Sequence, residues 1–139
     1  MKILTIATAC LLDEEGRLLT VRKRGTQHFM LPGGKIEAGE RPLDAVAREL
    51  AEEIGLTLDE SDLHPLGQFE ARAANEPDHW VKADVFVGQV NRGSAILAQA
   101  EIDTLLWIAP HAPRDALLAP LLRERILPAL SQWLGGATG

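Results

Sequence analysis

Short apolar segments alternate with polar turns along most of the chain. β-branched and aliphatic residues dominate these segments, and Gly, Pro, Asn and Asp occupy the turns between them, a pattern typical of strands. The first two segments flank an acidic turn that ends in Gly16, which predicts a hairpin. The pattern predicts strands over residues 3–12, 17–24, 65–73, 80–90 and 105–108.

The first apolar segment also has a faint likeness to an export signal. It follows Met1-Lys2 and precedes Cys10, but its positive region is a single lysine. Thr5 and Thr8 also interrupt its apolar stretch. These features favour a first β-strand.

Two helices are predicted, one in the middle of the chain and one at its end. The first runs from Pro42 to Ile54, because proline suits the first helical position and Gly55 suits the left-handed residue that closes a helix. The second begins at Arg114, where leucines recur at helical spacing, and Pro120 and Pro128 are expected to break or kink it.

The segments outside these elements are expected to be irregular. Pro32-Gly33-Gly34 should interrupt regular structure and open a loop to Arg41, and residues 135–139 should form a frayed tail. With no internal repeat and no linker, the economical interpretation is one α+β domain over residues 1–139.

Composition narrows the class of protein. A hydrophobic content of 46% with 24% charged residues is typical of a globular chain, and a net charge of −6 argues against sequence-independent binding to nucleic acid. No apolar run approaches the roughly 20 residues of a membrane span, so no membrane partner is expected. The single cysteine, Cys10, excludes an intramolecular disulfide, fits a buried apolar position and favours a reducing, cytoplasmic location.

The predicted helix 42–54 carries the chemistry. Its apolar residues fall on one arc, which is expected to face the core: Leu43, Val46, Ala47, Leu50 and Ile54. Glu49, Glu52 and Glu53 fall on the adjacent arc at spacings of three and four, so their carboxylates converge. A solvated acidic face is the plain alternative, but hard oxygen ligands at this density favour Mg²⁺ or Mn²⁺.

Neighbouring residues strengthen the metal hypothesis. Gly33 and Gly34 allow the backbone to approach a metal or ligand closely. Arg48 can bridge Glu40 and Glu49 and so orient the carboxylates, although an ordinary surface ion pair is the alternative.

Residues 34–56 together resemble the signature of the Nudix hydrolases at every defined position. The match reads Gly34-x5-Glu40-x7-Arg48-Glu49-Leu50-x-Glu52-Glu53-x-Gly55-Leu56. The resemblance implies an α/β/α sandwich with a mixed central sheet, and hydrolysis of a nucleoside diphosphate linked to another group X. The substrate is then a small nucleotide, attacked by water at phosphorus. A nucleotide-sensing module of the same fold that turns nothing over is the alternative, and a homodimer stays open because many relatives dimerise.

The resemblance also assigns roles by position. Glu52 and Glu53 would be metal ligands, and Glu49 either a third ligand or the general base. The backbone carbonyl of Gly34 would add a ligand, and Arg48 would orient the glutamates. In some relatives the base lies on a later loop, so Glu76 and Glu101 are alternative bases.

Candidates for substrate contact are basic or aromatic residues near the expected pocket. Strand alternation places Arg22 and Arg24 on one face and Lys23 on the other. An exposed basic edge or aromatic core packing is the plain alternative for each of them. The selected candidates are Arg22, Arg24, Lys35, Arg72, Phe29 and Trp80.

Overall fold

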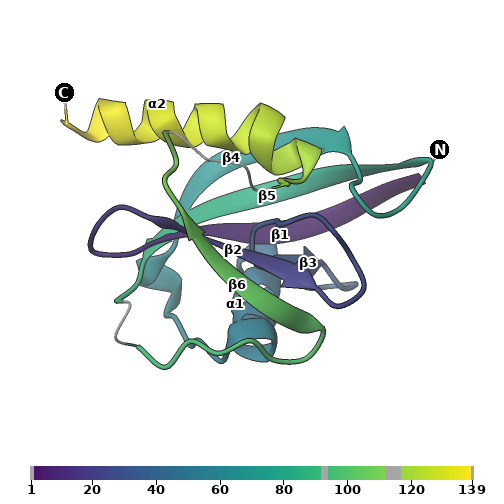
Figure 1. Ribbon diagram of the computed structural model, residues 1–139, viewed down its shortest axis with the longest axis horizontal. Helices are drawn as coiled ribbons and strands as arrows, with labels where there is room; N and C mark the ends of the chain where they lie inside the picture. Colours follow the sequence, from purple (N-terminus) through teal and green to yellow (C-terminus); the bar gives the residue numbers. More distant parts are fainter. Residues whose placement is uncertain (1, 92–93, 112–116, 139) are drawn as a thin grey trace.

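Strand β1 (Lys2–Leu12) runs through the centre of a mixed six-stranded sheet (Figure 1). The structure is a computed structural model and describes residues 2–91, 94–111 and 117–138. Along one edge β1 pairs in parallel with β5 over its whole length. Along the other edge it pairs with β3 at Ile6–Thr8 and with β2 at Leu12. The strand order is β4-β5-β1-β2-β6, with β3 paired to β1. The remaining strands are β2 (Leu18–Lys23), β3 (Gly33–Lys35), β4 (His64–Arg72), β5 (His79–Gln89) and β6 (Ile102–Ile108).

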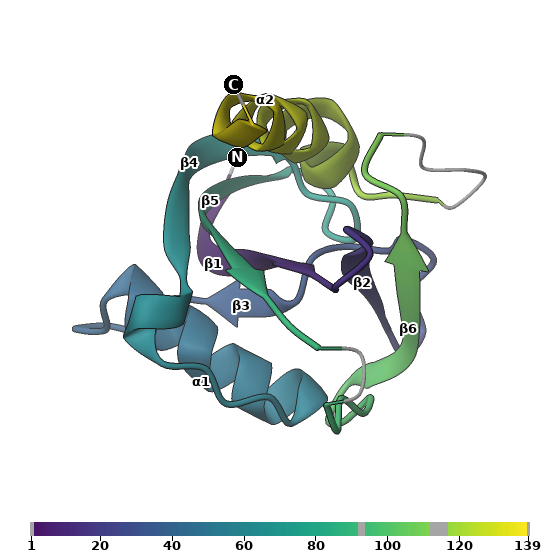
Figure 2. The same ribbon diagram turned by 90° about the vertical axis from the view of Figure 1, so that its left-hand side faces the viewer.

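Alternation along β1 supplies the core on both faces of the sheet. Ala7, Ala9 and Leu11 pack with helix α1 (Pro42–Ile54) in one cluster. Cys10 and Leu12 pack in the other cluster, with residues of η2 (Leu121–Ile126) and α2 (Leu127–Thr138). Figure 2 shows α1 and α2 on opposite sides of the sheet. The α/β/α sandwich with a mixed central sheet is therefore confirmed.

Helix α1 has the predicted bounds and ends. Pro42 stands at its start, and Gly55 adopts a left-handed conformation with φ +67°. The N–H of Gly55 donates to Ala51 and that of Leu56 to Leu50, which satisfies carbonyls at the end of the helix. The buried arc is displaced from the predicted one: Ala45 is fully buried, whereas Ala47 and Leu43 are only partly buried.

Strand β3 falls where the sequence predicted a break. Pro32-Gly33-Gly34 was expected to interrupt regular structure, yet Gly33 and Gly34 pair with Thr8 and Ala7. A Cβ on Gly33 would lie 2.2 Å from the carbonyl oxygen of Ala7, so only glycine lets the two backbones come this close. The glycines that signalled a loop are what permits the pairing.

The C-terminal helical region begins later than predicted and is not broken by Pro128. Residues 114–116 lie outside the described residues, and Leu118 forms a bridge with Phe29 before the helix starts at Pro120. Proline disfavours helical conformation in the residue before it, which explains the extended segment. Just before Pro128, η2 is a π-helix at whose end the N–H of Leu127 donates to the carbonyl of Leu122. This wider turn accommodates a residue that has no N–H of its own.

Two smaller predictions are wrong. The tail from Gly135 was expected to fray, but α2 continues to Thr138. Leu130 and Leu134 dock this helix in the core, and a glycine costs only about 1 kcal/mol in a helix. Strand β6 begins at Ile102, earlier than the predicted residue 105. The polar residues Asp103 and Thr104 interrupt the apolar pattern and so hide the start of the strand, although both contact Arg22 of β2.

Among the described residues, every helix is too short or too polar to span a membrane.

Replacing Gly33 with alanine should destabilise the fold strongly. Gly33 has φ +147° and its added methyl would meet backbone, so we expect a loss of about 2–4 kcal/mol in the free energy of unfolding. Gly16 is the matched control, because it has φ +78° with nothing within 4 Å, so Gly16→Ala should cost only about 1 kcal/mol. Urea unfolding measures both variants. Equal losses would show that the approach of β3 to β1 is not tight.

Candidate metal centre

Helix α1 presents three glutamates to one hollow at the end of β3. Glu53 is buried, with 6% of its surface exposed, and the exposed fractions of the Glu49 and Glu52 side chains are 17% and 56%. Three further glutamates reach this hollow from other segments. The acidic hollow is defined by Glu37, Glu49, Glu52, Glu53, Glu76 and Glu101.

Arg48 ties the glutamates together. Its Nε and Nη2 donate to the two carboxylate oxygens of Glu40 at 2.8 and 2.9 Å, a bidentate pair. Its Nη1 donates to Glu49 Oε1 at 3.0 Å and lies 3.6 Å from Glu52 Oε1. Nη2 also donates to the carbonyl of Lys35 at 3.1 Å, which links the helix to β3. Arg48 thus bridges Glu40 and Glu49, as the sequence predicts, and also lies close to Glu52.

The glycines of β3 bring backbone against these carboxylates. The N–H of Gly33 donates to Glu53 Oε1 at 2.8 Å. A Cβ on Gly34 would lie 2.5 Å from the carboxylate carbon of Glu49. The absence of a side chain at Gly34 therefore keeps the space beside Glu49 open.

The electrostatics of Glu53 follow from its burial. Desolvation raises its pKa from 4.5 to about 7, against the lowering effect of the Gly33 hydrogen bond, and the nearby charge of Glu49 raises it further. Arg48 has the opposite effect on Glu40: its hydrogen bonds, with that of the Glu37 backbone, hold the pKa of Glu40 at about 2. A buried carboxylate beside other carboxylates is stabilised in its charged form by a cation.

The donor atoms of these residues are of the kind that a divalent cation prefers. Within the described part of the chain, no three acidic, imidazole or thiol side chains stand in an arrangement that could by itself hold a metal ion. The glutamates instead line an open space that Gly34 leaves free, with hard oxygen donors only. This suits a cation that keeps several waters and shares its remaining positions with a substrate.

A second hollow adjoins the acidic hollow on the other face of the sheet. The apolar hollow is lined mainly by Leu4, Ile6, Met30, Leu31, Val81 and Leu122. Thr8 also lines it, and its buried Oγ1 has no hydrogen-bond partner among the described residues. Lys23, Gly34, Lys35 and Glu76 line both hollows, so the two communicate around β3.

Some of the predicted substrate residues lie at these hollows. Lys35 lines both, and Arg72 lines the apolar hollow. Both alternative bases, Glu76 and Glu101, line the acidic hollow. Trp80 lies instead in a third hollow, the Trp80 hollow, defined by His28, Arg72, Glu76, Asp78, His79 and Trp80.

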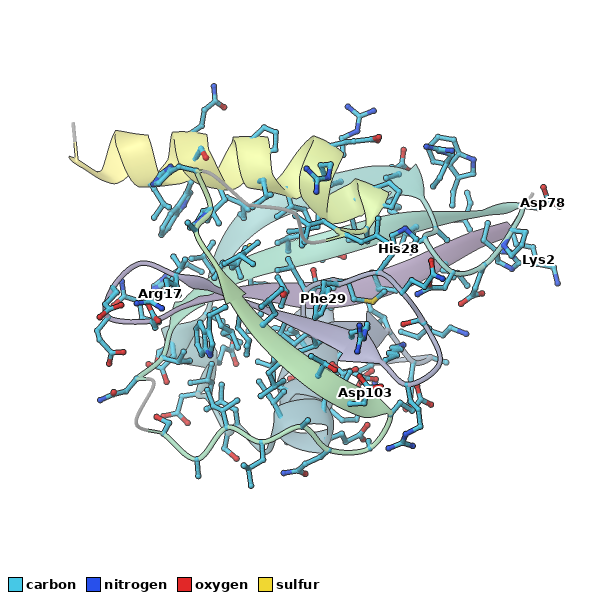
Figure 3. All side chains as sticks on the ribbon, in the orientation of Figure 1. Lys2, Arg17, His28, Phe29, Asp78 and Asp103 are labelled. Atoms are coloured by element: carbon cyan, nitrogen blue, oxygen red, sulfur yellow. The ribbon has the colours of Figure 1, made fainter. Side chains whose placement is uncertain are left out.

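Arg22, Arg24 and Phe29 line none of these hollows. The guanidinium of Arg22 lies 5.2 Å from the centre of the Phe29 ring, donates to Thr104 and pairs with Asp103 at 3.5 Å. Arg24 is exposed, and its backbone N–H donates to Glu101. Figure 3 labels Phe29 and Asp103, the partners of Arg22.

The sequence offers Lys23 as a candidate for phosphate contact together with Arg22 and Arg24, but only the two arginines are among the selected residues. Lys23 lines the acidic hollow and the apolar hollow, lowers the pKa of Glu53, and lies 3.9 Å from Glu101 through its Nζ. The signal was present, because Leu19 and Val21 pack toward α1 and alternation places Lys23 on the same face. All three residues are basic, so charge alone does not indicate which of them lines the hollows.

Comparison with known proteins identifies the class. The sequence model of the family described as "NUDIX domain" matches residues 2–130. A MutT-like protein of Streptomyces ambofaciens is 42% identical over 117 residues, which cover 84% of this chain and 70% of that protein. The chain therefore belongs to the Nudix hydrolase family, which confirms the resemblance seen in residues 34–56.

Two further relatives define the range of the similarity. An 8-oxo-dGTP diphosphatase of Haemophilus influenzae is 41% identical over 73 residues, which cover 50% of this chain and 54% of that protein. The match thus spans about half the length of that relative. The crystal structure of a MutT protein from Methanosarcina mazei Go1 has a TM-score of 0.77 at 22% identity, and covers 94% of this chain and 95% of that one. At this identity the likeness concerns the fold.

The stability of metal-free protein should fall as pH rises through the titration of Glu53. Between pH 4.5 and about 7 the folded chain holds a proton that the unfolded chain has released, so a higher pH favours unfolding. The contribution of this one group is roughly 3 kcal/mol over that window. Glu53→Gln keeps the acceptor for Gly33 and removes the titration. Urea unfolding in EDTA at several pH values measures the difference, and identical pH profiles for the two proteins would contradict the assignment.

Proposed function

We propose that this chain is a divalent-metal-dependent pyrophosphohydrolase that acts on a nucleoside diphosphate linked to another group X. The observation that carries the proposal is the acidic hollow, where Gly33, Gly34 and Arg48 hold three α1 glutamates together. The similarity to a Haemophilus influenzae protein named 8-oxo-dGTP diphosphatase supports a nucleotide as the substrate.

Glu52 and Glu53 would hold the cation, together with the backbone carbonyl of Gly34, and Glu49 would be either a third ligand or the general base. Mg²⁺ is the first choice and Mn²⁺ the second, because all these ligands are hard oxygen atoms. When bound, the cation neutralises charge on the phosphates and makes a coordinated water easier to deprotonate.

The protein's own groups then divide the remaining work. Arg48 fixes the orientation of Glu49 while Glu40 fixes that of Arg48. Lys23 and Lys35 line the hollow with positive charge that suits phosphate oxygens. The attacking water gives its proton to a carboxylate, for which Glu49 is the first candidate and Glu76 and Glu101 are the alternatives.

The apolar hollow is the natural place for the nucleoside. It adjoins the acidic hollow through Gly34 and Lys35, and apolar side chains form most of its lining. Thr8 offers a buried hydroxyl without a partner among the described residues, which a base or sugar can satisfy.

A substrate panel tests the proposal directly. Release of phosphate or pyrophosphate is measured with Mg²⁺, and with EDTA as control, on canonical and oxidised nucleoside triphosphates, ADP-ribose, nucleotide sugars, dinucleoside polyphosphates and coenzyme A. Metal-dependent turnover of one class supports the proposal and identifies X. No turnover by folded, metal-binding protein would favour a nucleotide-sensing module.

Neutralising two candidate ligands should abolish turnover without unfolding the chain. The double variant Glu52→Gln, Glu53→Gln keeps the shape of both side chains and removes their charge, so we expect activity below about a thousandth of the unmodified protein. Glu14→Gln, Glu15→Gln is the matched control, because it changes an adjacent pair of exposed glutamates in the β1–β2 turn. Circular dichroism verifies folding, and retained activity in the folded site variant would refute the metal assignment.

Filling the space at Gly34 should impair catalysis more than stability. The methyl of Gly34→Ala displaces the Glu49 carboxylate, which is the end of a side chain rather than backbone, so we expect kcat to fall about 10- to 100-fold. Gly39 lies in the loop between β3 and α1, with nothing within 4 Å of an added methyl, so Gly39→Ala should keep its kcat. Equal kcat values for the two variants would remove Gly34 from the site.

A further inference from the structure

The Trp80 hollow joins the proposed substrate site from a third direction. It shares Arg72, Ala73, Ala74 and Glu76 with the apolar hollow, and Glu76 lines all three hollows. His28 comes from the segment between β2 and β3, and Asp78 from the β4–β5 turn (Figure 3). A ligand that spans the acidic and apolar hollows therefore has one more place for a chemical group.

The lining of the Trp80 hollow combines an aromatic surface with both signs of charge. Trp80 exposes 37% of its surface, and Pro77 and Pro120 add apolar walls. Arg72 supplies donors, Glu76 and Asp78 supply acceptors, and the imidazoles of His28 and His79 can do either. The buried Nδ1 of His28 has no hydrogen-bond partner among the described residues.

The turn that carries these groups is held in place. His79 Nδ1 lies 2.7 Å from the carbonyl of Pro77, and its Nε2 lies 3.8 Å from Glu76 Oε2. The backbone N–H of Lys2 donates to the carbonyl of Asp78 at 3.1 Å, and Asp78 itself has φ +59°. The hollow is thus shaped before a ligand arrives, which lowers the entropy lost on binding.

The side chains that line the Trp80 hollow favour some kinds of ligand over others. A phosphate would meet the carboxylates of Glu76 and Asp78, which repel it. A hydroxylated ring matches better, because each hydroxyl both donates and accepts while the ring face packs on an indole. We propose that the Trp80 hollow binds a sugar ring, so that X is a sugar and the substrate is a nucleoside diphosphate sugar. This inference rests on the proposed function.

The test compares substrates that share a base and differ in the presence of the second sugar. With Mg²⁺, kcat and KM are measured for UDP-glucose against UTP, ADP-ribose against ATP, and GDP-mannose against GTP. Trp80→Leu should raise KM for the sugar nucleotide about tenfold and leave that of the triphosphate unchanged. Trp133→Leu is the matched control, because Trp133 has the same 37% exposure and lies on α2 outside the hollow. Asp78→Asn provides a second variant if Trp80→Leu fails to fold, because Asp78 lines the Trp80 hollow and neither of the other two hollows.

The outcomes separate the inference from the function on which it rests. Hydrolysis of triphosphates without hydrolysis of sugar nucleotides would overturn the inference and leave the pyrophosphohydrolase intact. So would an equal effect of Trp80→Leu on both members of a pair, or a Trp80-dependent KM for a dinucleoside polyphosphate instead. If nothing is hydrolysed, calorimetry with ADP-ribose and ADP in Mg²⁺ decides. Tighter binding of ADP-ribose that is lost in Trp80→Leu supports the sugar site, and equal binding refutes it.

Discussion

The close packing of β3 between β1 and α1 is the constraint on which the rest of the structure depends. Gly33 brings its backbone against Ala7 of β1 and donates its N–H to Glu53 of α1. Gly34, one residue on, lies against the carboxylate of Glu49. A side chain at Gly33 would push β3 away from β1, and one at Gly34 would displace the Glu49 carboxylate. The two glycines therefore set both the position of the glutamates and the space in front of them.

The same packing concentrates an electrostatic cost at the site. Glu53 is buried beside Glu49, and its pKa rises to about 7, so the charged form is disfavoured in the folded chain without a cation. The positive charge of Arg48 offsets part of the repulsion among the α1 glutamates. Glu40 binds Arg48 in a bidentate pair and so holds it beside these glutamates. The fold therefore tolerates an unfavourable arrangement that a divalent cation would relieve, as is expected of functional sites.

The sequence predicted α1 and most of the strands because these depend on local signals, whereas the mixed sheet was implied by the family resemblance of residues 34–56. Pro42, Gly55 and the apolar arc of α1 all act within a few turns of helix, and the spacing of Arg48 and the glutamates could be read directly. The pairing of β3 could not be read, because it depends on the approach of Gly33 to a distant strand. The π-helix before Pro128 and the choice of Lys23 over Arg22 depend likewise on tertiary packing.

The topology explains how a site can use both faces of one sheet. The acidic hollow lies on the α1 face, and the apolar hollow lies under η2 on the other face. A continuous strand along β1 would separate them, but β3 is three residues long and ends at Lys35. Gly34 and Lys35 line both hollows at that end, and Glu76 reaches them from the β4–β5 turn. A charged group and an apolar group of one ligand can therefore be bound on opposite faces, because the short strand leaves a path between them.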